Sequence, residues 1–443
     1  MRRFYIISGG TLNYIDPHLA LFSPAFGTVG RKLKKSLVKA IAASGDEDTY
    51  IDLILTRAAV GGKKREKEEQ ALLESAGLSD LKTNADLRTL IDHLVSLPDT
   101  KGIVLAAAVC DFKPLDVEPH FGTYFEEPGK NYPRLSSNQK YLLTIVPDEK
   151  ILGRVRKTRK DIFLVAFKQV TGKTPDEMYL NGLELLKRSS ANLVLANDTR
   201  ARLNMVITPE QARYHETHDR DEALNGLAEM IVARSQLTFT RSTVLPGHAP
   251  VSWKDPRVPG SLRTVVNHCI AQGAYKPFGG STVGHFAVKI GDGEFLTSRR
   301  KTDFNKLNEV GLVRIETTGD NRVVAYGFKP SVGGQSQRII FSEHPQMDCI
   351  VHFHCPRKPG SLVPFRSQRE YECGSHQCGK NTSIGLASFE DGEILAVMLD
   401  KHGPNVVFNR NIDPQKVIRF IEENFDLAGR TDNVGMPAVV HVH

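Results

Sequence analysis

The chain of 443 residues has few cysteines, a single tryptophan and no long hydrophobic run. Six unevenly spread cysteines are too few for a disulfide scaffold and favour reduced thiols. The longest apolar stretch, near residues 102–109, is far shorter than the roughly 20 residues that span a bilayer. The N-terminal residues lack the length and cleavage pattern of a signal peptide. We therefore expect a cytoplasmic protein without a membrane partner.

Neither sign of charge dominates, because the chain has 58 Lys and Arg residues and 51 Asp and Glu residues. Basic residues cluster at 31–39, 63–67 and 154–160, as expected of solvated helix faces or of a phosphate-binding surface. Aromatic residues do not alternate with them, which disfavours nucleic acid as a partner. The 40% hydrophobic content is ordinary for a globular protein, and the length predicts two or three domains.

Short apolar runs alternate with amphipathic ones in the first half. Repeated strand–helix units predict an α/β fold, a Rossmann-like doubly wound sheet that is mostly parallel and binds ligands beyond the carboxyl ends of its strands. Strands are expected at 4–8, 50–56, 102–108, 162–167 and 192–196, and helices at 31–43, 84–97 and 175–189.

A proline-rich segment at 238–260 predicts a linker between a domain at 1–237 and a second one at 261–443. The second domain alternates β-rich stretches with helices expected at 261–272, near 333–341 and at 413–425. This pattern also predicts an α/β or α+β domain.

Small and polar residues follow the predicted strands of the first half. Gly9-Gly10-Thr11 closes the first strand, the run at 106–108 leads to Asp111, and Leu195-Ala196-Asn197 ends a later strand. Glycines at a strand end let a phosphate approach backbone N–H groups, although such turns are often only structural.

In their order along residues 4–232, these segments resemble phosphopantothenoylcysteine synthetase, the nucleotide-dependent ligase of coenzyme A biosynthesis. Ile15-Asp16-Pro17 and Arg134-Leu135-Ser136-Ser137 match further motifs of that family. The resemblance implies that CTP or ATP binds with Mg²⁺ and that a carboxylate is joined to an amine. It assigns nucleotide binding to Gly9, Gly10, Thr11, Gly27, Ala108, Asp111, Arg134, Phe167 and Asn197, and phosphate neutralisation in catalysis to Lys168. The family's intermediate-stabilising Asn falls at Ser23, so nucleotide binding without ligation is the alternative.

Two histidines in a His-x-His motif are the sharpest chemical signal in the second half. His352 and His354 share a face if both lie on one strand, and His402 follows an apolar strand at 394–399. Three neutral imidazoles with an open fourth position suit Zn²⁺ or another divalent ion.

Residues 262–430 resemble the class II aldolase/adducin fold, which implies that His352, His354 and His402 are its metal ligands. The loops that hold a substrate phosphate in that family correspond to His285, Arg300, Lys301 and Ser331. The added cations favour a strongly anionic ligand, or a loop that has lost the pocket.

The family's catalytic Glu falls at Gly333, and Glu372 or Tyr371 is the candidate replacement as acid/base. Nearby, Cys373 and Cys378 are either ligands of a second metal ion or ordinary loop residues.

Together the two halves predict a bifunctional metabolic enzyme, a carboxylate–amine ligase-like half and a zinc-dependent aldolase, epimerase or lyase-like half acting on small anionic metabolites. The alternative is a nucleotide- and metal-binding assembly protein of the adducin kind, because the residues at Ser23 and Gly333 have changed. Both families also imply a homo-oligomer, a dimer or a tetramer.

Overall fold

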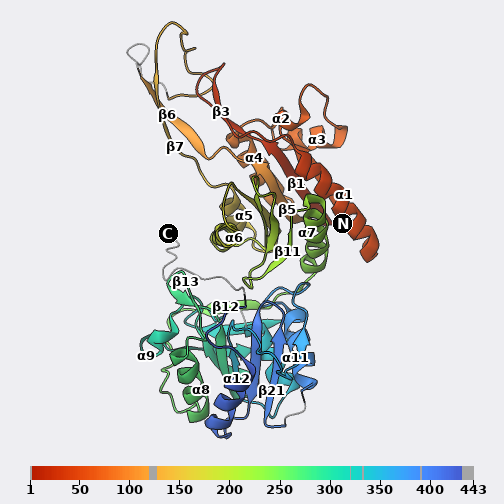
Figure 1. Cartoon of the computed structure of the whole chain (residues 1–443). Coiled ribbons are helices and arrows are strands. Elements are labelled where there is room, and N and C mark those ends of the chain that lie inside the picture. The colour runs from red at the N-terminus through yellow and green to blue at the C-terminus, as the bar shows by residue number, and fades with distance from the viewer. Residues whose placement is uncertain (1, 119–126, 320, 332–333, 390–391, 432–443) are drawn as a thin grey trace. The chain divides into compact units, whose positions relative to one another are not determined.

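The structure is a computed structural model that describes residues 2–118, 127–319, 321–331, 334–389 and 392–431 (Figure 1). The chain divides into two compact units. The first comprises Met1–Ile207 and His215–Ser235, and the second comprises Thr208–Tyr214 and Gln236–His443. The division therefore does not follow the chain strictly, because a short segment of the first half belongs to the second unit.

A seven-stranded sheet in the order β11-β10-β9-β8-β5-β1-β4 forms the centre of the first unit. Neighbouring strands from β4 through β9 pair in parallel, and β10 is antiparallel to β9. The strands are continuous apolar runs because side chains on both faces are covered; Ile6 and Ile7 of β1 are both fully buried. Their bounds are β1 Arg2–Gly10, β4 Thr49–Leu55, β5 Thr100–Ala108, β8 Phe163–Val170, β9 Leu193–Asp198, β10 Asn204–Ile207 and β11 Arg213–Thr217.

The helices of the first unit show the periodicity expected of amphipathic segments. In α1, Leu33, Leu37 and Ile41 recur at four-residue intervals and are buried. Capping boxes begin α4 at Thr83 and α6 at Thr174. The helices are α1 Thr28–Ser44, α2 Arg57–Val60, α3 Lys67–Ser75, α4 Asn84–Ser96, α5 Leu152–Thr158, α6 Pro175–Ser189 and α7 Arg220–Ser235.

The predicted mostly parallel α/β sheet of the first half is confirmed, with each expected strand and helix present within a few residues. Two small antiparallel ribbons were not expected. One pairs β2 (Leu12–Tyr14) with β3 (Ala20–Phe22), and the other pairs β6 (Phe112–Glu118) with β7 (Leu142–Pro147). Figure 1 shows the β6–β7 ribbon extending away from the main sheet of the first unit.

A buried ion-pair cluster connects α2 and α3 to the loop before α4. Asp80 Oδ2 accepts a hydrogen bond from Arg57 Nε at 2.5 Å, and Asp80 Oδ1 accepts one from Arg65 at 2.6 Å. The Arg65 side chain is only 2% exposed. Burial alone would raise the pKa of Asp80, but the hydrogen bonds from Arg65 and Arg57 outweigh it and lower the pKa to about 2.

We expect Asp80→Asn to lower the free energy of unfolding of the first unit by about 2 kcal/mol at pH 7. Because the pKa of Asp80 is lower in the folded state, its contribution is complete above about pH 5 and disappears as the pH falls toward about 2. Urea unfolding at several pH values measures this. The control is Asp161→Asn, since Asp161 pairs with Arg159 but is 68% exposed and should contribute much less. A deficit for Asp80→Asn that does not change between pH 7 and pH 2 would contradict the assignment.

A nine-stranded mixed sheet in the order β12-β18-β17-β16-β15-β19-β22-β21-β20 runs through the second unit. Its strands are β12 Arg241–Leu245, β15 His285–Gly291, β16 Glu294–Ser298, β17 Leu312–Thr317, β18 Arg322–Tyr326, β19 Cys349–His352, β20 Phe365–Arg366, β21 Ile394–Leu399 and β22 Gly403–Phe408. A separate ribbon pairs β13 (Pro277–Phe278) with β14 (Ser281–Thr282).

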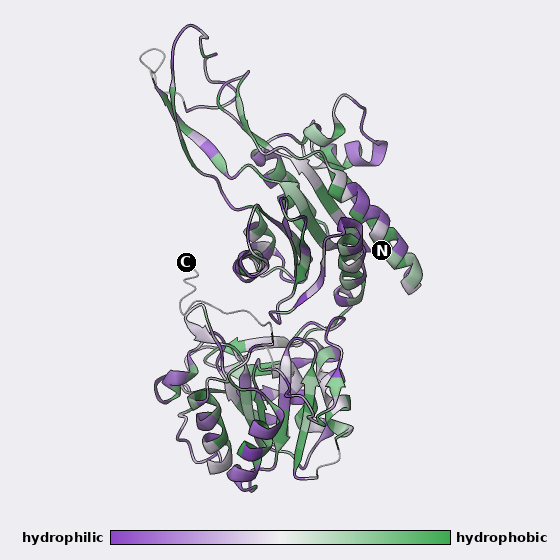
Figure 2. Cartoon of the chain, in the orientation of Figure 1, coloured by the Kyte–Doolittle hydropathy of each residue, from purple (hydrophilic) through white to green (hydrophobic). Residues whose placement is uncertain are grey.

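Helices cover both faces of this sheet and enclose two apolar cores. One core joins the sheet to α8 (Gly260–Ala271) and α12 (Pro414–Asn424), and the other joins it to α10 (Gly334–Glu343) and α11 (His376–Ala387). A short 3₁₀ turn at Phe304–Lys306 precedes α9 (Leu307–Val310). Figure 2 shows the strands as mainly hydrophobic and the outer helix faces as hydrophilic. The second half is thus also α/β, as predicted, although α11 was not expected.

Residues 238–260, expected to be a linker, are structured within the second unit. Strand β12 pairs in parallel with β18, and Val251 bonds to Leu312 through backbone groups in both directions. Trp253 is 3% exposed and belongs to the core that α8 and α12 share. Prolines exclude a helix here, but they do not exclude an edge strand or a packed irregular segment.

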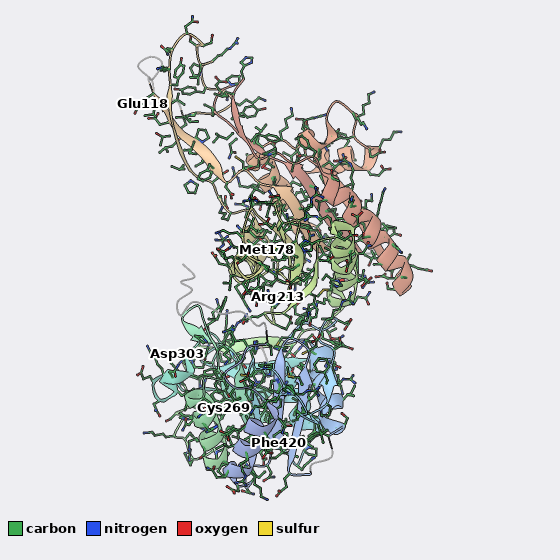
Figure 3. The ribbon with its side chains drawn as sticks, viewed as in Figure 1. Glu118, Met178, Arg213, Cys269, Asp303 and Phe420 are labelled. Atoms are coloured by element: carbon green, nitrogen blue, oxygen red, sulfur yellow. The ribbon has the colours of Figure 1, made fainter. Side chains whose placement is uncertain are left out.

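Several cysteines are free thiols buried in the second unit. Burial raises the pKa of Cys269, on α8 and labelled in Figure 3, and also that of Cys349. The pKa of Cys355 rises to about 12 for the same reason. These three thiols are therefore held in the protonated, unreactive form.

Across the ranges that the structure describes, none of the helices has both the length and the apolar character needed to cross a lipid bilayer.

Candidate metal centre and nucleotide site

Three histidines converge in the second unit. One nitrogen from each of His352, His354 and His402 lies within 4.8 Å of the other two. Their ring centroids are 4.6 to 5.2 Å apart, and all three side chains are largely buried. A tetrahedral Zn²⁺ ion holds nitrogen ligands about 3.3 Å apart, so the three nitrogens would have to move closer together around an ion.

A hydrogen bond determines which nitrogen of His352 is free to bind a metal ion. Nδ1 lies 2.8 Å from the carbonyl oxygen of Pro404, which can only accept, so Nδ1 carries the proton. Nε2 therefore carries an unprotonated lone pair, and this buried atom has no hydrogen-bond partner among the described residues. Burial lowers the pKa of His352 to about 4, so the imidazole stays neutral. A neutral, oriented imidazole with an unused lone pair is the form that binds a metal ion.

The chain brings the three residues together by a route that differs in part from the prediction. Strand β19 ends at His352, so His354 lies just beyond the strand and alternation along a strand does not place it. His402 lies in the turn between β21 and β22, and β22 pairs with β19. Gly403 makes this possible: its φ is +139°, and an added Cβ would lie 2.1 Å from the carbonyl oxygen of Phe353.

His285 lies beside the group, opposite His352 in the register of β15 and β19. The two rings are 4.7 Å apart and inclined by 32°. Gln337 of α10, fully buried, places its amide nitrogen 2.9 Å from His285 Nδ1. Burial and the neighbouring His352 hold the pKa of His285 well below its usual value. The expected substrate-binding residue His285 is therefore a neutral side chain in contact with a predicted metal ligand.

The other expected substrate-binding residues lie in loops near the end of β16, which pairs with β15, the strand that begins at His285. Ser331 Oγ is 3.5 Å from Thr297 Oγ1 of β16, and the Ser331 amide donates to the carbonyl of Ser298. Arg300 and Lys301 are exposed in the turn after β16, where Lys301 has a φ of +57°. The two cations are therefore open to an anionic ligand, and their role stays a prediction.

The candidate acid/base residues lie in the loop before α11. Tyr371 and Glu372 are half-buried, and this loop follows β20, whose Arg366 pairs with Leu399 of β21 three residues before His402. Gly333, where the family's Glu is expected, lies outside the described residues. Cys378 belongs to the first turn of α11 and its amide bonds to the Ser375 cap, which favours the plain structural reading over a role as ligand of a second metal ion for this residue.

Asn405 was missed by sequence reasoning. It lies opposite His352 in the register of β19 and β22, and its buried Oδ1 has no hydrogen-bond partner within the described part of the chain. No motif signals it, because only the pairing of the two strands brings it beside the histidines.

In the first unit, the expected nucleotide site lies where the strand order reverses. Strand β1 is flanked by β4 on one side and by β5 on the other. The connection from β1 to β4 therefore runs toward one edge of the sheet, and the connection from β4 to β5 runs back past β1 in the opposite direction. Gly10 is opposite Ala108, and Asn197 is opposite Gln169, the neighbour of Lys168. Gly10, Ala108, Lys168 and Asn197 thus lie toward the carboxyl edge of the sheet, where ligands of doubly wound folds bind.

The glycines at this edge have a structural reason of their own. An added Cβ on Gly9 would lie 2.1 Å from Thr56 Oγ1, and one on Gly10 would lie 2.0 Å from the carbonyl oxygen of Ser23. Thr11 is buried and donates to Asn84 Oδ1 at 2.6 Å. Gly27, with a φ of +75°, is the N-cap of α1. Close packing therefore explains the first two glycines without a phosphate, while Gly27 leaves the amino end of a helix at the site.

The polar candidates differ in how accessible they are. Asp111 is exposed, and its carboxylate pairs with Lys150 at 2.6 Å. Arg134 is exposed, Phe167 and Lys168 are half-buried, and Asn197 is 7% exposed. Asp111, Arg134 and Lys168 are therefore accessible to a ligand, whereas Asn197 is buried on β9.

Comparison with known proteins identifies the two halves. Residues 268–358 match the family model described as class II aldolase and adducin N-terminal domain, and this range contains His285, His352 and His354. The second half is a class II aldolase-like domain. It is joined to an N-terminal region similar to the coenzyme A biosynthesis bifunctional protein CoaBC of Thermococcus kodakarensis, with 25% identity over 181 residues, 37% of this chain and 42% of that protein. The chain thus spans about two fifths of the length of that relative.

Two solved structures are each similar to a part of the chain. The DNA/pantothenate metabolism flavoprotein from Streptococcus pneumoniae is 19% identical with a TM-score of 0.39, covering 53% of this chain and 99% of that one. L-fuculose 1-phosphate aldolase is 17% identical with a TM-score of 0.29, covering 36% of this chain and 79% of that one.

Proposed function

We propose that the class II aldolase-like half of the fusion is a metal-dependent lyase or epimerase that acts on a small anionic, phosphorylated substrate. The observation that carries the proposal is the convergence of three histidine nitrogens within 4.8 Å, with a buried His352 lone pair that has no partner among the described residues. In a domain of this family, such a donor set suits Zn²⁺ or a similar divalent ion better than it suits a structural core.

Each residue near the histidines has a distinct part in the proposal. His352, His354 and His402 would hold the ion, which supplies Lewis-acid polarisation of a carbonyl or hydroxyl oxygen. Gln337 orients His285 beside them through its hydrogen bond to Nδ1. Tyr371 or Glu372 would move the proton in place of the family's missing Glu, and the exposed Arg300 and Lys301 would attract the anionic group of the substrate.

The proposal is tested by metal-dependent turnover. Purified protein stripped with a chelator and then reloaded with Zn²⁺ should cleave or epimerise at least one phosphorylated sugar in a screen of aldol substrates. Activity should disappear on stripping and return on reloading. Tight metal binding without turnover of any substrate would favour the alternative, a metal-binding assembly protein without this chemistry.

We further propose that the first half binds CTP or ATP with Mg²⁺ and works as a carboxylate–amine ligase. The support is the shared carboxyl edge that carries Gly10, Ala108, Lys168 and Asn197, together with the helix end at Gly27. The phosphates would be neutralised by Arg134 and Lys168, and Asp111 would bind the Mg²⁺ ion. A cytoplasmic homo-oligomer stays part of this proposal.

We expect Asp111→Ala and Arg134→Ala to weaken nucleotide binding at least about tenfold, because each removes a charged contact to the metal–phosphate group. Isothermal calorimetry with CTP and ATP in the presence of Mg²⁺ measures this. Asp48→Ala is the matched control, since Asp48 is an exposed carboxylate just before β4, at the amino edge of the same sheet. No heat with either nucleotide for the wild type would reject a nucleotide site.

A further inference from the structure

Residues 208–214 are a polar segment that is buried in the second unit. The segment connects β10 to β11 by a tight turn. In this turn the Thr208 amide donates to the Ala212 carbonyl, the Gln211 amide donates to the Thr208 carbonyl, and Gln211 has a φ of +66°. Thr208, Glu210, Gln211 and Tyr214 are each at most 5% exposed. Because tips of hairpins normally lie at the surface, burial of such polar residues indicates a specific contact.

One contact reaches the turn that presents His402. Lys401 Nζ donates to the carbonyl oxygen of Arg213 at 2.8 Å and lies 4.8 Å from the centre of the Tyr214 ring. Tyr214 also directs its hydroxyl to the carbonyl oxygen of Asp400 at 3.4 Å. Arg213, labelled in Figure 3, therefore contributes through its backbone and Tyr214 through its side chain.

A second contact reaches the loop before α11. The carboxylate of Glu210 accepts a hydrogen bond from the backbone amide of Cys373, the residue that follows Tyr371 and Glu372. The same short segment thus touches the turn that carries a predicted metal ligand and the loop that carries the candidate acid/base residues.

The turn itself needs such support. Lys401 has a φ of +53°, in the left-handed region that costs a residue with a side chain about 1 kcal/mol or more. A turn in this conformation keeps one geometry only when its surroundings hold it. The ammonium of Lys401, fixed by the Arg213 carbonyl and the Tyr214 ring, supplies that constraint immediately before His402.

We propose that Tyr214 and Lys401 are positioning residues of the metal centre, which hold the Asp400–His402 turn so that His402 meets His352 and His354. The inference rests on the proposed metal site and adds that the site is incomplete without residues 208–214, which the sequence places among the strands of the first half.

The test is metal affinity and the cobalt absorption spectrum of the full chain. Chelator competition should show Co²⁺ and Zn²⁺ bound about 10- to 100-fold more weakly by Tyr214→Ala, as for other residues that orient a ligand. Tyr214→Phe keeps the ring and should stay within about threefold of the wild type. Lys401→Met should weaken binding about fivefold. Both weakened variants should show altered visible Co²⁺ bands, because the position of one ligand changes.

Lys416→Met is the control, since Lys416 is also an exposed lysine of the second unit, paired with Glu393 at 2.9 Å. Wild-type affinity and spectrum in both Tyr214→Ala and Lys401→Met would overturn the positioning role. If Tyr214→Ala does not fold, Lys401→Met alone decides, because the Lys401 side chain is exposed. A wild-type chain that binds neither ion would instead overturn the proposed function.

Discussion

Replacing His352 or His402 by Ala is expected to weaken Zn²⁺ binding by about 100- to 1,000-fold, because each change removes one of three nitrogen ligands. The wild-type chain should carry about one ion per molecule after purification with added metal. Metal content measured by atomic spectrometry after dialysis should then fall to near zero in both variants. His352→Ala should have the larger effect, since its Nδ1 is already fixed by the Pro404 carbonyl and Nε2 is held ready.

His344→Gln separates the loss of a ligand from the loss of a buried histidine. His344 is 7% exposed in the same unit, but its Nε2 lies 2.9 Å from Ser383 Oγ and it does not belong to the three-histidine group. Its replacement should cost stability while leaving one ion per chain. Equal metal content in His352→Ala, His402→Ala and the wild type would show that the three histidines are structural.

Gly403→Ala is expected to destabilise the second unit by about 3–4 kcal/mol. A Cβ at this position would lie 2.1 Å from the Phe353 carbonyl oxygen, so β22 would have to move away from the chain that follows β19. The positive φ of +139° adds strain for any residue with a side chain. Because His402 and His354 flank these two backbones, the same shift should weaken metal binding.

Trp253 provides the measurement, since it is the single tryptophan and lies in the core of the second unit. Its fluorescence during urea unfolding follows that unit alone. Gly360→Ala is the control: Gly360 also has a positive φ, +81°, but its added Cβ would meet no atom within 4 Å. The control isolates backbone strain at about 1–2 kcal/mol. Equal losses in the two variants would show that the close contact with Phe353 is unimportant.

The sheet of the first unit could be predicted because its strands are continuous apolar runs and its helices have regular apolar faces. Helix α11 could not. Its buried face consists mainly of small or polar residues such as Gly379, Asn381 and Ser383, which carry no hydrophobic period. Its glycines permit close packing instead: a Cβ on Gly379 would lie 2.6 Å from Ile339, and one on Gly385 would lie 2.3 Å from Val397. Contacts of this kind are decided by the tertiary structure.

The candidate metal site was also predictable only in part. The His-x-His spacing, the histidine after an apolar strand and the family resemblance together predict the three histidines of the group. The strand-face argument for His354 does not hold, because β19 ends at His352. The residues that surround the histidines could not be predicted: Asn405 becomes a neighbour of His352 only through strand pairing, and Tyr214 is nearly 190 residues from the turn it contacts. Neither carries a local pattern that would mark it.

The buried thiols of Cys269, Cys349 and Cys355 can be used as chemical probes of local opening in the second unit. Since only a thiolate reacts with an alkylating reagent, these protonated, enclosed groups should stay unlabelled as long as their core is closed. Each transient opening would expose them, and the alkyl groups then accumulate irreversibly. Mass spectrometry of chains labelled over hours would therefore detect a rare opening as a permanent mass increase. Bound metal should slow that increase about tenfold for each 1.4 kcal/mol of stability that it adds.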